Sequence, residues 1–240
     1  MALGSQPRWT VRSADAGVGI DVGLRDYMLR VYNYMASGLA LTGIVAYVAA
    51  YSGFYESIAR TPLIWLVILA PLGLVMLMSF GVQRMQASTL QLVFWLYAGL
   101  MGLSLAMVFL VFTGASVARV FFITAGTFAA MSLYGYTTQR DLSRFGSFLF
   151  MGLIGIVIAS LVNMFLASSA LQFAISVIGV VVFVGLTAWD TQQIKEMYVD
   201  EAYAGGEAAT KTAIMGALRL YLDFINLFMM LLQLLGTRRD

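Results

Sequence analysis

The sequence contains no cysteine and no histidine, and only 11% of its 240 residues are charged. Without cysteine, the chain can form neither disulfides nor thiolate metal sites, and it has no cysteine nucleophile. Without histidine, any response to pH near neutrality must come from carboxyl groups in unusual surroundings. The net charge of +2, with no dense basic stretch, also argues against nucleic acid as a partner.

The chain is rich in apolar side chains, and 61% of its residues are hydrophobic. A soluble domain usually has about 25% charged residues, so lipid rather than water must surround most of this surface. The apolar runs are continuous rather than alternating, which favours helices over strands in a bilayer. The sequence therefore predicts an all-α integral membrane protein.

A helix that crosses a hydrocarbon core about 30 Å thick needs roughly 20 mainly apolar residues. Seven stretches meet this requirement: 31–52, 62–80, 91–112, 117–137, 147–166, 170–190 and 213–236. Residues 1–30 lack the apolar core of a signal peptide and are predicted to form a flexible cytosolic tail. The transmembrane domain then covers 31–236, with an exposed polar stretch at 191–212 and a short C-terminal tail at 237–240.

The positive charges are distributed unequally between the two sides of the predicted bundle. If the N-terminus lies in the cytosol, ten of the 14 lysines and arginines fall on the cytosolic side. This excess predicts a cytosolic N-terminus and a C-terminus outside. The short tail and the absence of sorting signals favour a bacterial inner membrane.

Two of the twelve acidic residues lie within predicted spans, Asp190 at the end of the sixth and Asp223 inside the seventh. An acid at membrane depth is energetically costly and usually faces the bundle interior or a wet cavity. The sixth span runs toward the cytosol and the seventh returns from it. Both aspartates therefore belong to the cytosolic half, where they could meet.

Two carboxylates in a poorly solvated site cannot both ionise cheaply, so they would titrate as a coupled pair. A calcium ion could take the place of a shared proton. Calcium takes about 6–8 oxygen ligands, however, and two aspartates are too few for a dedicated site. Weak calcium binding, completed by water and carbonyl groups and in competition with protons, is expected, and no resident cofactor.

The spacing leaves a structural alternative open. Arg219 precedes Asp223 by four residues and shares a helix face with it, so it could simply neutralise that acid, while Asp190 could be an interfacial residue. Asn226 is expected to form an interhelical hydrogen bond. Arg84, at the cytosolic end of the second span, fits an anchor that follows the positive-inside rule.

Three stretches resemble the Bax inhibitor-1 family, also called the transmembrane Bax inhibitor motif family. Ala188–Lys195 (AWDTQQIK) resembles its sixth-helix signature, and Leu220–Phe228 (LYLDFINLF) resembles its seventh. Gly135–Ser143 (GYTTQRDLS) is similar to its fourth-loop pattern. The resemblance extends over nearly the whole chain and points to a bacterial-type member.

The resemblance implies a seven-helix bundle whose last helix is central and surrounded by the other six. It also implies a pH-sensitive calcium leak, because Asp190 and Asp223 match the family's paired aspartates. Arg84 falls where bacterial members carry an arginine that can latch onto the pair in a closed state. In those members the arginine stands in a basic cluster, whereas here its neighbours are Gln83 and Met85.

Two other classes of protein remain open. One is a non-conducting membrane regulator, acting in stress or cell death, that binds other membrane proteins through 191–212. The other is an intramembrane aspartyl protease, which also uses aspartates on consecutive spans. Its Y-D and G-x-G-D motifs do not match here, because Asp190 follows Trp189 and Asp223 follows Leu222. We therefore expect an ion channel for calcium and not an enzyme.

Overall fold

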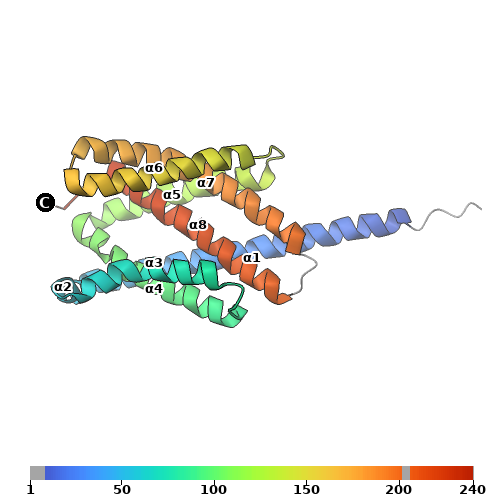
Figure 1. Ribbon diagram of the computed structural model, residues 1–240, viewed down its shortest axis with the longest axis horizontal. Helices are drawn as coiled ribbons and strands as arrows, with labels where there is room; N and C mark the ends of the chain where they lie inside the picture. The colour runs from blue at the N-terminus through green and yellow to red at the C-terminus, as the bar shows by residue number, and fades with distance from the viewer. Residues whose placement is uncertain (1–8, 202–205, 240) are drawn as a thin grey trace, which may run out of the picture.

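The computed structural model describes residues 9–201 and 206–239, with side chains described for 22–198 and 206–239. Throughout these residues the regular structure is helical (Figure 1). The helices are α1 (Trp9–Tyr51), α2 (Phe54–Ala59), α3 (Leu63–Gly81), α4 (Ala87–Val111), α5 (Gly114–Thr137), α6 (Ser143–Leu166), α7 (Ser169–Glu201) and α8 (Gly206–Leu235). Seven of them, all except α2, are long and apolar enough to cross a membrane. The predicted fold class, an all-α bundle of seven spanning helices, is confirmed.

Several helices continue past the ends of the predicted spans. α1 begins at Trp9, so most of the predicted tail at 1–30 is helical, while residues 1–8 lie outside the described part. α7 and α8 likewise extend through most of the polar stretch 191–212, up to the undescribed residues 202–205. A helix satisfies its own backbone hydrogen bonds, so it need not end where the chain leaves the lipid.

α8 lies between two groups of helices. It packs against α1 and α4 on one side and against α5 and α7 on the other, and Figure 1 shows it crossing the bundle between these groups. In its apolar stretch 56% of the residues are buried, the highest share of the seven spans. α3 packs mainly against α4, and α6 against α7. The main neighbours of the last helix are therefore four helices rather than six.

The residues that follow α8 are attached to the turn between α4 and α5. The main-chain nitrogen of Thr113 donates to the oxygen of Thr237 at 3.0 Å, and that of Arg239 donates to the oxygen of Val111 at 2.9 Å. The predicted tail at 237–240 is thus paired with the bundle as far as the structure describes it.

Close packing of α5 against α7 depends on a glycine. A Cβ atom at Gly135 would lie 2.1 Å from the main-chain oxygen of Ala188. Small residues let two membrane helices approach closely, and here only a hydrogen fits between the two backbones. The contact joins two of the stretches that carried the family resemblance.

We predict that Gly135→Ala lowers the free energy of unfolding by roughly 1–3 kcal/mol, because the added methyl group overpacks this contact. Gly126→Ala is the matched control on the same helix, since a Cβ there meets no atom within 4 Å. Alanine also favours the helix over glycine, so the control should be at least as stable as the native chain. Thermal unfolding in detergent measures both, and equal stability of the two variants would contradict the contact.

Candidate functional site

Asp190 on α7 and Asp223 on α8 meet inside the bundle. Only 9% of Asp190 and 4% of Asp223 is exposed. Their carboxyl groups interact directly with each other. An ionised carboxylate can only accept hydrogen bonds, so a hydrogen bond between the two needs a proton on one of them. The two acids that stood out in the sequence thus form one buried pair, called the aspartate pair below.

One oxygen of the pair has no partner. Oδ2 of Asp223 is buried and forms no hydrogen bond with any residue that the structure describes. Leaving a buried polar atom unpaired is costly, and such an atom in a native fold calls for an explanation. Because this oxygen has no hydrogen-bond partner among the described residues, it is available to bind a proton or a cation.

Arg219 lies one turn before Asp223 on α8 and acts electrostatically on both carboxyl groups. Its side chain is exposed. Among the described side chains, the ion pair in direct contact is Lys211–Glu207, at 3.5 Å, so Arg219 influences the pair from a distance. Arg219 therefore does not neutralise Asp223 through a salt bridge. That neutralisation was the structural alternative left open by the spacing of the two residues.

Arg84 lies away from the aspartate pair. It occupies the turn after α3, where its side chain is exposed and borders a groove along α3 that Phe80 and Met76 also line. α3 packs mainly against α4, and Arg84 is not among the charges that act on Asp190 or Asp223. The predicted latch is thus not formed in this arrangement, in which Arg219 is the cation that acts on the pair.

Asn226 also differs from expectation. Its Nδ2 donates to the main-chain oxygen of Leu222 at 2.8 Å, so the bond stays within α8 instead of joining two helices. An interhelical amide bond forms elsewhere, where Nδ2 of Asn163 on α6 donates to Oε1 of Gln172 on α7 at 3.1 Å.

A chain of hydroxyl groups begins directly beside the aspartate pair and connects three helices. Oγ1 of Thr191 donates to the main-chain oxygen of Thr187 at 2.7 Å and is hydrogen-bonded to Oγ of Ser132 on α5 at 2.9 Å. Ser132 is in turn bonded to the hydroxyl of Tyr32 on α1 at 2.7 Å. These bonds fix the turn of α7 that carries Asp190.

The next turn of α7 is attached to the connection between α5 and α6. Oε1 of Gln192 accepts from the main-chain nitrogen of Leu142 at 2.8 Å, and its Nε2 donates to the oxygen of Arg140 at 2.9 Å. Nζ of Lys195 donates to the oxygen of Tyr136 at 3.0 Å. These positioning roles were not predicted from the sequence, although all five residues of these contacts lie in stretches that resemble the family.

The aspartate pair alone does not make a metal cage. Among the described side chains there is no group of three or more His, Cys, Asp or Glu residues that could hold a metal ion. Calcium takes about 6–8 oxygen ligands, so an ion at the pair would need water or main-chain oxygens as well. So few protein ligands suit a calcium ion that binds weakly and transiently better than one that is bound permanently.

Comparison with known families identifies the family of the chain. Residues 24–240 match the family described as "Inhibitor of apoptosis-promoting Bax1". The chain belongs to the Bax inhibitor family. The match covers all seven spanning helices except the start of α1, and it confirms the resemblance seen in the sequence. A Bax inhibitor family protein with seven such helices is an integral membrane protein.

Bacterial relatives align with this Bax inhibitor family member over nearly its whole length. An uncharacterised protein of Rickettsia prowazekii (strain Madrid E) is 51% identical over 234 residues, which cover 96% of this chain and 98% of the relative. "Inner membrane protein YbhL" of Escherichia coli (strain K12) is 50% identical over 228 residues, or 94% and 97% of the two chains. An uncharacterised membrane protein of Streptococcus pyogenes serotype M3 is 33% identical over 219 residues, or 90% and 94%.

Proposed function

We propose that this protein is a pH-sensitive calcium leak channel whose gate contains Asp190 and Asp223. The observation that carries the proposal is the contact between two buried carboxyl groups on neighbouring membrane-spanning helices. Acids at membrane depth that pair with one another are typical of ion and proton pathways. Two carboxyl groups in contact are also the simplest site at which a proton and a calcium ion compete.

The proposed gate works through the charge of the aspartate pair. With one shared proton, the two carboxyl groups hold α7 and α8 together. Loss of that proton leaves two negative charges side by side where water is scarce, and they repel unless a cation lies between them. A change in protonation therefore changes the contact between the two helices, and calcium can replace the proton there.

In this proposal the described arrangement is the closed state of the channel, without a latch by Arg84. Beyond the aspartate pair, α8 presents apolar side chains, of which Phe224, Leu227 and Leu231 are buried against its neighbours. An ion cannot cross this packed segment without losing its hydration. Conduction along α8 therefore requires α8 to move relative to the helices around it. A change of charge at Asp223 would drive this movement by altering the repulsion between the two carboxyl groups.

The proposed location is the bacterial inner membrane. A relative with 50% identity is named an inner membrane protein, and the unequal distribution of lysine and arginine between the two sides supports a cytosolic N-terminus. The proposal includes no enzymatic activity and no resident cofactor; calcium ions and protons are the species that the channel handles.

We predict that purified protein in dye-loaded liposomes admits calcium at a rate that depends on pH around neutrality. Asp190→Asn and Asp223→Asn should each abolish this pH dependence, because an amide neither shares nor releases the proton. Asp141→Asn is the matched control. This exposed acid lies outside the spans, and hydrogen bonds from the side chain and main chain of Ser143 lower the pKa of Asp141. Its replacement should leave the flux unchanged.

Absence of calcium flux above that of empty liposomes, with the protein folded, would refute the channel. The result would favour the non-conducting regulator that binds other membrane proteins. A flux whose pH dependence survives both substitutions in the aspartate pair would keep the channel but place the gate elsewhere.

The same assay distinguishes the two cations. Arg219→Gln should move the midpoint of the pH-dependent flux to higher pH, because removing a nearby positive charge disfavours the ionised pair. Arg84→Gln, which removes an exposed charge away from the pair, should shift the midpoint much less. A larger shift in Arg84→Gln than in Arg219→Gln would instead support a latch by Arg84 in the conducting cycle.

A further inference from the structure

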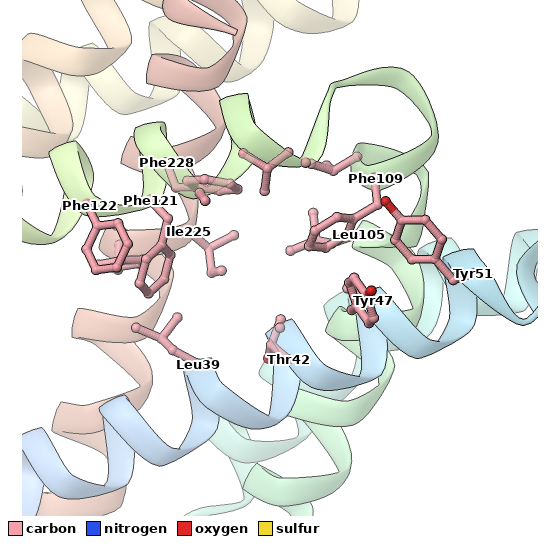
Figure 2. Close-up of a pocket in the computed structure, with 17 residues that line it drawn as sticks. Leu39, Thr42, Tyr47, Tyr51, Leu105, Phe109, Phe121, Phe122, Ile225 and Phe228 are labelled. Carbon is pink, nitrogen blue, oxygen red and sulfur yellow. The ribbon is translucent and has the colours of Figure 1, made fainter. Parts of the chain in front are cut away.

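A large apolar cavity lies apart from the aspartate pair, between α1, α4, α5 and α8. Its volume is about 460 Å³. Figure 2 shows side chains from these four helices around one common space, with Leu39 and Thr42 on α1 and Phe121 on α5 facing it. Neither Asp190 nor Asp223 is among the residues that line it.

The cavity exists because α1 and α5 do not pack closely against each other. α1 packs against α4 and α8, and α5 packs against α7 and α8. Small residues face the gap from both sides, Gly43 and Ala46 from α1 and Gly114 and Ala118 from α5. Two residues of the lining, Tyr47 and Phe122, are 53% and 73% exposed, so the cavity opens sideways to the surface that lipid surrounds.

One end of the cavity carries a fixed positive charge. Tyr51, at the end of α1, lines the cavity, and Nη2 of Arg239 donates to its hydroxyl at 2.9 Å. The guanidinium group of Arg239 also lies 5.8 Å from the centre of the Tyr51 ring. The main-chain bond from Arg239 to Val111, at 2.9 Å, holds this arginine in place.

Other arginines lie on the same side of the bundle as Arg239. The helix ends and connections on this side of the bundle carry Arg60, Arg119 and Arg238, against Glu56 as the acid among the described side chains. The positive charge that Arg239 fixes at one end of an apolar cavity is complementary to a molecule with an anionic head and a hydrocarbon tail. Tyrosine and arginine at the level of lipid headgroups form such contacts with anionic lipids.

We propose that this cavity binds one acyl chain of an anionic phospholipid, with the lipid phosphate against Arg239. The chain would lie between α1 and α5, where protein side chains leave the space open. A guanidinium group binds phosphate through charge-assisted hydrogen bonds, and Arg239 is already oriented at the entrance by Tyr51. The proposal goes beyond the calcium channel and does not depend on it.

Binding of a lipid here would act on the same helix that carries the aspartate pair. Phe224, Ile225 and Phe228 of α8 form one wall of the cavity, and Phe224 directly follows Asp223 in the sequence. A chain packed against this wall stabilises α8 in the described position, since a ligand that binds one arrangement shifts the population toward it.

The test uses delipidated protein in detergent, to which phosphatidylglycerol or phosphatidylcholine is added. Bound lipid is counted by native mass spectrometry, and stability is followed by thermal unfolding. Phosphatidylglycerol should raise the melting temperature of the native chain, and Gly43→Leu should lose this rise because its side chain enters the cavity. Gly126→Leu adds the same side chain where no atom lies within 4 Å and outside the cavity lining, so it should keep the rise.

A second pair of variants tests the headgroup contact without altering the cavity. Arg239→Gln should weaken phosphatidylglycerol binding by about tenfold, the effect of losing one charge-assisted hydrogen bond, and should remove the preference over phosphatidylcholine. Arg60→Gln removes an equal charge from the same side and should change the affinity far less. The proposal would be overturned if phosphatidylglycerol raised the melting temperature of Gly43→Leu as much as that of the native chain. Equal binding of the two lipids by the native chain would overturn it as well.

Discussion

The structure depends on two carboxyl groups that face each other across the interface between α7 and α8. In a medium of low polarity, neither can remain charged without a proton, a cation or hydrogen bonds to compensate it. The chain has no histidine, so this pair is the buried group best suited to respond to protons. In the proposed gate, the charge of this pair decides how closely the two helices can lie.

The two helices that carry the pair are both tied to their neighbours, but through different contacts. α7 is fastened by the close contact at Gly135, by the hydroxyl chain that begins at Thr191, and by the bonds from Gln192 to the connection between α5 and α6. α8 borders the apolar cavity on another of its faces. The hydroxyl of Tyr221 on α8 is also hydrogen-bonded to Oγ1 of Thr42 on α1 at 2.7 Å. Both aspartates therefore sit on anchored helices, and only α8 of the two has the apolar cavity beside it.

The sequence was sufficient to predict the seven spans and to single out the two aspartates, because long apolar runs and isolated intramembrane acids are local signals. Spacing alone left their meeting open, and the family resemblance is what indicated a pair. The sequence did not predict that Arg219 rather than Arg84 acts on the pair. That depends on α3 packing against α4, away from α8, and no local pattern encodes which helices become neighbours. The beginning of α1 at Trp9 was missed for a related reason, since hydropathy reports contact with lipid and not helix length.

The central claim is that the aspartate pair shares one proton for which calcium competes. Infrared difference spectroscopy measures it directly, through the carbonyl stretch of protonated carboxylic acids in the protein with and without added calcium. The account predicts a protonated-acid band near neutral pH that calcium removes and that is absent in both Asp190→Asn and Asp223→Asn. A band that persists at saturating calcium, or that remains in both variants, would contradict it.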